Sequence, residues 1–187
     1  TFTIDRGTYN DTQMSNAAGA ALQRQIREVV VPEIDKYRFG KICEGAKTTV
    51  TGKVTKANAY DAFLTGATTL IENNVPLVGS CAFVSSDFYK NIKEDSSFIR
   101  NGDMSQEVLI KGQVGTIDGI PLIVVPKSYF PENVEFILTN QAATTSPVKL
   151  SEYKIHDNPP GINGWLVEGR VYYDAFVLEN KKSAIYV

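Results

Sequence analysis

The sequence is poor in the residues from which most catalytic and metal sites are built. It has one histidine, His156, and two cysteines, Cys43 and Cys81. A single histidine excludes histidine-based metal clusters and the HExxH motif. Two cysteines without CxxC spacing exclude a disulfide framework and favour free thiols in a reducing cytoplasm. A catalytic Cys–His pair would need one cysteine beside His156, in a turn rich in Pro and Gly, and nothing local supports that pairing.

The sequence also lacks a charge excess and long apolar runs. It has 19 basic and 21 acidic residues, for a formal net charge of -2, so the basic patch of a nucleic-acid-binding protein is missing. The longest apolar runs, such as 29–31 and 122–125, are far too short to span a bilayer. Neither GxGxxG nor GxxxxGK[ST] occurs. We therefore expect no catalytic residues, no cofactor, no metal ligands and no enzymatic activity. A hydrolase with carboxylates paired by tertiary contact is the alternative left open.

The chain has the composition of an ordinary globular protein. Of its 187 residues, 43% are hydrophobic and 21% are charged, which is enough for one sizeable core or two small lobes. No secretory signal is visible, because the chain opens with polar residues. It also opens without Met, so we expect the protein to begin further upstream.

Hydrophobic periodicity predicts two long helices, followed by strands with short helices. The first helix runs from about 10–12 to 37, with small residues in its first half. Pro32 should kink it near Val29, or start a new helix. After a polar connection over 41–52, a second helix is expected over 55–73. This order of elements predicts an α+β fold.

Four further segments have the patterns of strands. They are 79–84, 135–139, 148–155 and the alternating stretch 164–187, which reads as a long strand or a bent hairpin. Ser85, Ser86 and Asp87 should cap a short helix after the first of these strands. Residues 156–161 form a cluster of chain breakers.

The stretch 103–126 contains the strongest local signals. Asp103 and Gln106 have capping-box spacing ahead of a short helix, and Gly112 would end that helix. Two apolar runs, 114–117 and 120–125, are then separated by Asp118 and Gly119, which predicts a tight hairpin. The predicted turn, cap and kink positions of the chain are Pro32, Gly112, Gly115, Asp118, Gly119 and Pro121. Pro121 cannot donate to a ladder, so its strand should be an edge there or open onto a loop.

The order of these motifs resembles that of tailed-phage major capsid proteins, from phages and prophages of Gram-positive bacteria. The resemblance begins with residues 2–6, a polar turn and a small-residue helix that ends in the VPEID-x-[YF]-R-F pattern at 31–39. It continues with Ser85 to Tyr89, the hairpin region 111–121 and a C-terminal aromatic strand. The resemblance covers essentially the whole chain.

This resemblance implies a Hong Kong 97-like fold. Residues 1–79 would form the remnant of an extended loop and the peripheral-domain helices, including a spine helix. Residues 80–147 would form the axial domain, and 148–187 the strands that return to the peripheral domain. Such a protein is a structural subunit that self-assembles into hexamers and pentamers of an icosahedral shell around double-stranded DNA. It would be assembled in the bacterial host cytoplasm and located in the virion.

The resemblance also implies partners, and one alternative function is left open. Scaffolding, portal or decoration proteins are expected partners, and packaged DNA would be met only through non-specific proximity. The alternative is the shell protein of an encapsulin-like nanocompartment, or a head-associated accessory protein.

Overall fold

The computed structural model describes residues 1–11, 17–95 and 113–187, which form two compact units. Unit 1 consists of Thr1–Asp35 and Ser146–Asp174, and unit 2 of Lys36–Thr145 and Ala175–Val187. The expected peripheral and axial divisions at 1–79, 80–147 and 148–187 stay a prediction.

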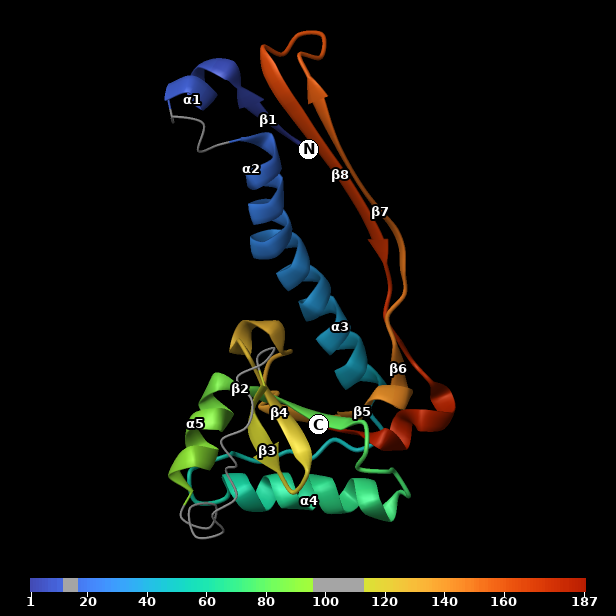
Figure 1. The fold of residues 1–187 in the computed structure, drawn as a ribbon. Helices are drawn as coiled ribbons and strands as arrows, with labels where there is room; N and C mark the ends of the chain where they lie inside the picture. Colours follow the sequence, from blue (N-terminus) through green and yellow to red (C-terminus); the bar gives the residue numbers. More distant parts are fainter. Residues whose placement is uncertain (12–16, 96–112) are drawn as a thin grey trace. The chain divides into compact units, whose positions relative to one another are not determined.

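Unit 1 combines a three-stranded antiparallel sheet with helical segments (Figure 1). The chain passes from β1 (Phe2–Asp5) to α1 (Arg6–Asp11), then to α2 (Ala18–Gln25), the π-helical turn η1 (Ile26–Val30) and the start of α3 (Val31–Gly45). It returns in β7 (Val148–Asp157) and β8 (Gly164–Tyr173). The strand order is β1-β8-β7, so β8 lies between a short strand and a long one.

A π-helical turn precedes Pro32, where we expected a kink or a new start. Pro32 is the second residue of α3, and the Val31 N–H bonds to the Ile26 carbonyl in the five-residue spacing of a π-helix. A proline ring clashes with the carbonyl four residues earlier in a regular α-helix. The wider turn before Pro32 relieves that clash, and the helical path continues without a break.

Unit 2 is built on a five-stranded sheet with strand order β10-β5-β2-β4-β3. The strands are β2 (Ser80–Ser85), β3 (Gln113–Ile117), β4 (Ile120–Val125), β5 (Phe136–Asn140) and β10 (Ile185–Tyr186). Helices α4 (Ala59–Glu72) and α5 (Ser86–Glu94) also belong to this unit. Shorter segments complete it: η2 (Lys127–Tyr129), η3 (Gln141–Ala143), β6 (Thr144–Thr145), β9 (Phe176–Val177) and η4 (Glu179–Ala184).

The sheet of unit 2 has apolar clusters on both faces. The first, which we call the α4–α5 cluster, includes Phe63, Leu70, Phe88, Ile92, Ala82, Val84, Leu122, Phe136 and Leu138. The second, the α3 cluster, includes Phe39, Val125, Phe130, Ile137 and Ile185. Alternate residues of a strand point to opposite faces, so β2 contributes Ala82 and Val84 to the first cluster and Phe83 to the second. The core of unit 2 is therefore a sheet covered on both sides.

The predicted hairpin is present as β3 and β4. Asp118 and Gly119 have φ of 49° and 78°, the positive values that a two-residue turn of this kind requires. The register shifts between Gln113 and Gly115, so Gly115 lies at a bulge of β3. The helix expected to end at Gly112 lies outside the described residues.

Pro121 lies near the start of β4, at a point where this inner strand has a paired neighbour on one side only. β4 pairs with β3 on one side and with β2 on the other. The pairing with β2 begins only at Leu122, which faces Ala82, while Pro121 faces Thr116 of β3. The missing N–H of Pro121 therefore falls just before the ladder between β2 and β4 begins.

Several expectations need correction. The connection expected over 41–52 begins later, because α3 continues to Gly45. The second long helix begins at Ala59 and not near 55, because the Asn58 side chain accepts a hydrogen bond from the Thr55 N–H at 2.6 Å and closes a turn there. His156 lies in β7 opposite Leu166, outside the expected turn. The C-terminal stretch is divided into β8, β9, η4 and β10.

The aromatic centre of the α4–α5 cluster gives a direct test of this core. Phe88 is fully buried, and its ring centroid lies 4.6 Å from that of Phe136. We expect Phe88→Ala to lower the free energy of unfolding by about 3–5 kcal/mol, because it leaves a cavity. Phe176, which is 50% exposed, is the matched control, and Phe176→Ala should cost less than about 1 kcal/mol. Urea denaturation of both variants measures the difference, and equal losses would contradict the proposed core.

Candidate functional site

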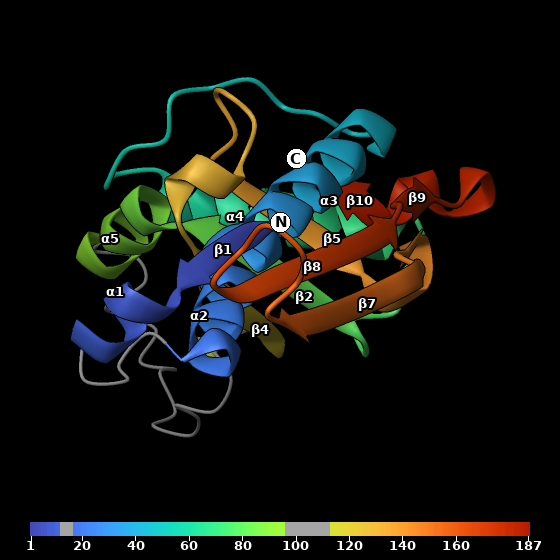
Figure 2. The ribbon, with the colours of Figure 1, turned by 90° about the horizontal axis from the view of Figure 1, so that it is seen from above.

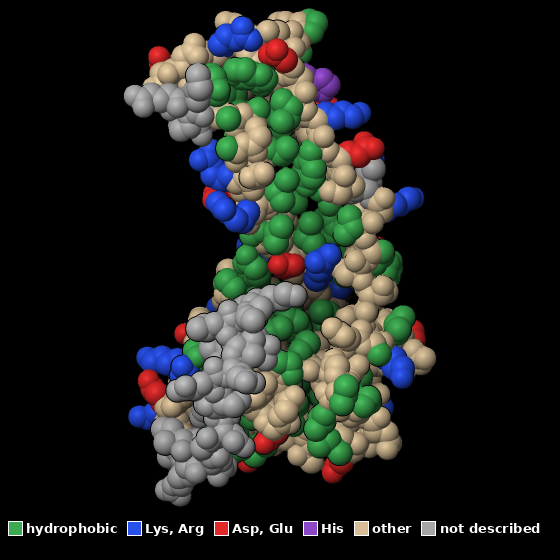
Figure 3. All heavy atoms as spheres, viewed as in Figure 1, with side chains coloured by type: hydrophobic (Ala, Val, Ile, Leu, Met, Phe, Trp, Pro, Cys, Tyr) green, Lys and Arg blue, Asp and Glu red, His purple; other side chains and the backbone are tan. Residues whose placement is uncertain are grey.

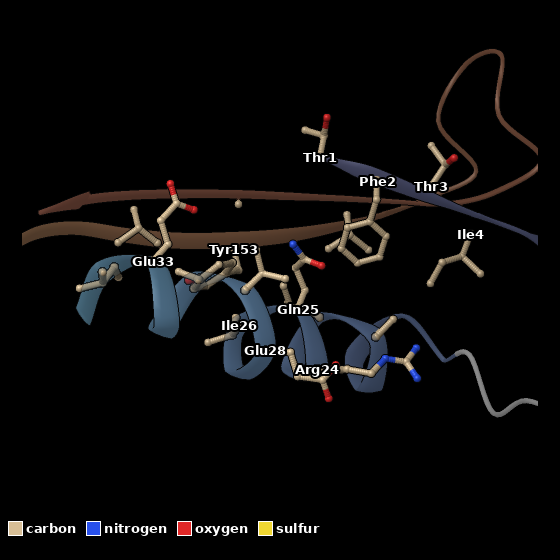
Figure 4. A pocket seen from close by; sticks show the side chains of 18 of the residues that line it. Thr1, Phe2, Thr3, Ile4, Arg24, Gln25, Ile26, Glu28, Glu33 and Tyr153 are labelled. Atoms are coloured by element: carbon tan, nitrogen blue, oxygen red, sulfur yellow. The ribbon is translucent and has the colours of Figure 1, made fainter. Parts of the chain in front are cut away.

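Within the described residues, unit 1 contains a groove of about 840 Å³. One wall is helical and comes from α2, η1 and the start of α3. The other wall is formed by β1, β7 and β8. Figure 4 shows Phe2 and Tyr153 reaching from the strands toward the helix, on which Gln25 and Ile26 lie. All residues that line the groove belong to unit 1.

The apolar lining follows the two periodicities that the sequence predicts. The helical wall presents Ala21, Leu22, Ile26, Val29, Val30 and Ile34, which recur at three- and four-residue spacing. The strand wall presents alternate residues of β8: Val167, Gly169, Val171 and Tyr173. Both stripes can be read from the sequence, but the contact between them cannot. Tyr153 was not predicted as part of the wall, although it alternates with charged neighbours in β7.

The groove is open, and its apolar side chains are incompletely covered. In the described part of unit 1, Ile4 and Val167 are the only hydrophobic side chains classed as buried. Helix α2 and the π-helical turn contain no buried residue, and Val29 is 45% exposed. Figure 3 shows hydrophobic side chains gathered between α2 and β8. Unit 1 thus leaves apolar surface open, and such surface is typical of interaction sites.

The far end of the strands in unit 1 is fixed by an aromatic and ionic cluster. The Arg6 guanidinium lies 5.5 Å from the centre of the Trp165 ring and donates a hydrogen bond to the Asn158 side chain at 2.9 Å. The Tyr9 ring meets Trp165 edge-on at 4.8 Å. These contacts hold β1 and α1 against the end of the β7–β8 hairpin, so they position the groove and bring no reactive group into it.

A polar cluster of unit 2 joins Ser85, Asp87, Lys127 and Glu135. The Ser85 hydroxyl donates to Glu135 at 2.7 Å and accepts from the Phe88 N–H at 3.0 Å, as an N-cap does. The Lys127 ammonium lies 2.9 Å from Glu135 and 3.2 Å from Asp87. Ser85 is fully buried and already saturated by these partners, so the cluster fastens α5 to the sheet and offers no accessible nucleophile.

The single histidine and the two cysteines belong to different units. His156 Nε2 lies 3.3 Å from Glu168 Oε1 on the surface of unit 1, whereas Cys43 and Cys81 belong to unit 2. Burial, followed by the charge of Glu44, raises the pKa of the Cys43 thiol to about 11, and burial raises that of Cys81. Neither thiol is thus activated as a nucleophile. Among the described residues, no group of three or more His, Cys, Asp or Glu could hold a metal ion.

The predicted turn and kink residues lie in different units. Pro32 follows the π-helical turn in unit 1, beside the groove residues of α3. Gly115, Asp118, Gly119 and Pro121 lie in the hairpin of unit 2. Within the ranges that the structure describes, none of the helices has the length and apolar character needed to cross a bilayer.

The fold of this chain is also found in solved phage structures. The structure superposes on one from Mycobacterium phage Che8 with a TM-score of 0.70 over 99% of this chain, at 14% sequence identity. It superposes on the capsid structure of cyanophage P-SCSP1u with a TM-score of 0.62 over 100% of the chain, at 15% identity. The chain has a phage capsid-protein fold. The predicted α+β class and Hong Kong 97-like fold are thereby confirmed.

The capsid-protein fold is also found in a third structure. A virus-like particle from Pyrococcus furiosus matches 99% of this chain with a TM-score of 0.59 and 12% identity. The chain spans 67% of the Che8 protein, 66% of the cyanophage protein and 72% of the Pyrococcus protein, or about two thirds of their length. No family model and no curated protein sequence matches the chain.

The charged cluster of unit 2 predicts a specific pH dependence of stability. The hydrogen bonds that the Lys127 ammonium donates to Glu135 and to Asp87, with that to Glu135 the larger cause, raise the pKa of Lys127 above its ordinary value of 10.5. A raised folded-state pKa adds stability that is fully present below pH 10.5 and is lost as the pH rises through the higher folded value. We expect Lys127→Met to lower the urea midpoint at pH 7, and the difference from the unaltered protein to shrink above pH 10.5.

Lys90, an exposed lysine on α5, supplies the control for this test. Lys90→Met removes the same charge but not the cluster, so its difference from the unaltered protein should stay nearly constant over this pH range. Parallel pH profiles for the two variants would contradict the assigned role of Lys127.

Proposed function

We propose that this chain is a structural subunit of an icosahedral phage head, which self-assembles into hexamers and pentamers that enclose double-stranded DNA. The observation that carries the proposal is the capsid-protein fold, which extends over essentially the whole chain. Such a subunit acts through its surfaces and not through a catalytic centre.

The open structure of unit 1 supports this proposal. Its apolar groove and half-exposed helix leave surface that packing against neighbours would cover. Rings of identical subunits form when heterologous contacts close under rotation, so each subunit presents two different complementary surfaces. The near-neutral net charge of -2 keeps repulsion between many copies small.

The finer features of the proposal follow from the same role. The protein would be assembled in the cytoplasm of a Gram-positive bacterial host, and it would reside in the virion. Its first partner is itself, and scaffolding, portal or decoration proteins are further partners. Packaged DNA would lie near it without specific contacts. Residues 1–79 and 148–187 would form the peripheral part, and 80–147 the axial part.

A nanocompartment shell or a head-associated accessory protein is the alternative. The likeness to the virus-like particle from Pyrococcus furiosus is compatible with a shell of another kind, but its TM-score of 0.59 is below the 0.70 of the phage structure. The comparisons do not favour this alternative over a phage head.

Assembly in solution tests the proposal. The protein, expressed as the full product of its reading frame, would be measured by size-exclusion chromatography with light scattering over about a hundredfold range of concentration. We expect it to form capsomers or closed particles that negative-stain electron microscopy shows as rings or shells. If it stays monomeric at the highest concentration, the proposed function is wrong.

A further inference from the structure

The strand β7 is the outer strand of the sheet in unit 1, and its far edge pairs with no described strand. The sheet order is β1-β8-β7, and Figures 1 and 2 both place β8 between the other two strands. β7 is ten residues long and contains no proline. Its one irregularity lies near its start, between Val148 and Leu150. An edge of this length and regularity is a template for pairing with another strand.

Charged residues of both signs alternate on the face of β7 that points away from the groove. Glu152 and Lys154 are exposed and lie on either side of Tyr153, which lines the groove. On the neighbouring strand, Arg170 is opposite Glu152 and Glu168 is opposite Lys154. Opposite charges that face each other across strands stabilise the pair, and like charges destabilise it.

We propose that β7 is a self-pairing edge, which joins two copies of this chain as antiparallel strands about a two-fold axis at Tyr153. In this register Tyr153 faces Tyr153 of the second copy, and Glu152 faces Lys154 of the second copy. By symmetry, Lys154 of the first copy faces Glu152 of the second, so one pair of opposite charges lies on each side of the axis. The three-stranded sheet of each copy becomes half of a continuous six-stranded sheet.

The charges select this register over its neighbours. A two-fold axis perpendicular to the sheet pairs each residue with one whose side chain lies on the same face. The neighbouring registers that meet this condition have the axis one residue further along β7 in either direction. A shift that centres the axis on Glu152 places two carboxylates opposite each other. A shift that centres it on Lys154 places two ammonium groups opposite each other. Only the register centred on Tyr153 pairs unlike charges at these positions.

The same register extends the alternation of charge across both copies. Reading across the strands, the row runs from Arg170 to Glu152, then to Lys154 and Glu168 of the second copy. Its signs are positive, negative, positive and negative. The row on the other side of the axis is the same by symmetry. Glu152 and Lys154 then each lie between two charges of opposite sign, which is the arrangement expected of a self-complementary edge.

This pairing goes beyond the proposed function, because a two-fold contact differs from the heterologous contacts that close a ring of subunits. It can form between copies in solution whether or not a shell assembles. In a shell it would link two copies across a two-fold axis, and not neighbours within one ring. The two ideas therefore fail separately.

A cysteine placed on the proposed axis tests the register. Residues opposite each other on antiparallel strands have Cα atoms about 4.5–5.5 Å apart, within the range that a disulfide spans. Tyr153→Cys should thus give disulfide-linked dimers under mild oxidation, seen on non-reducing gels. Ser151→Cys is the matched control on the same strand. In this register the two residues at position 151 would lie four residues apart along the strands, about 13 Å, so this variant should not cross-link.

A charge exchange tests the same contact without cysteines. E152K places lysines opposite each other at both pairs, and K154E places carboxylates opposite each other. Each variant alone should lose dimers, with a dissociation constant raised about tenfold or more. An equimolar mixture of E152K and K154E restores opposite charges at every pair and should recover the dimer, measured by sedimentation velocity. Each substitution also changes the charge that faces Arg170 or Glu168 within its own chain. That change is present both in the single variant and in the mixture, so it does not account for a recovery of the dimer.

The outcomes separate this inference from the proposed function. Cross-linking at position 153 but not at 151, with recovery in the mixture, supports the pairing. Equal cross-linking at both positions, none at 153, or no recovery in the mixture overturns it. If shells assemble without the link at 153, the pairing is wrong and the shell role stands. If the link forms but no ring or shell is found, the pairing stands and the proposed function is wrong. Circular dichroism confirms that each variant is folded.

Discussion

The burial of β2 on both faces is the constraint on which the packing of unit 2 depends. This strand pairs with β4 on one side and β5 on the other, in parallel and antiparallel registers. Ala82 and Val84 enter the α4–α5 cluster and Phe83 packs against the α3 cluster. Because the sheet is covered on both sides, unit 2 has the interior of an independent domain.

Unit 1 is built differently, and this difference carries the functional argument. Its sheet and its helix enclose an open groove, and few of its described apolar side chains are buried. A domain with so little interior is stabilised by what it contacts. A subunit whose one half folds on its own core and whose other half presents open surfaces fits the proposed role in a shell. The capsid-protein fold, which extends over essentially the whole chain, is the other observation behind that proposal.

Local chemistry explains which parts of the fold could be predicted from the sequence. The turn at Asp118 and Gly119 and the N-cap at Ser85 depend on residues close in the chain, and both are present. The two stripes of the groove were also visible as periodicities. The contact between the two stripes was not visible in the sequence, because it depends on tertiary packing. Pro32 shows a similar limit, since a kink, a restart and a π-helical turn all relieve the same clash. His156 lies in a strand because pairing with β8 continues to Asp157, past the start of the predicted breaker cluster.

Native-state hydrogen exchange tests the contrast between the two units most directly. In the dispersed chain, amides of β2, β4 and β5 should exchange only through opening of the whole unit, whereas those of α2 should exchange at least about 100-fold faster. Protection of α2 should rise when the protein assembles. Equal protection of α2 and β2 in the dispersed chain would contradict the account, because it would show that unit 1 is stable without neighbours.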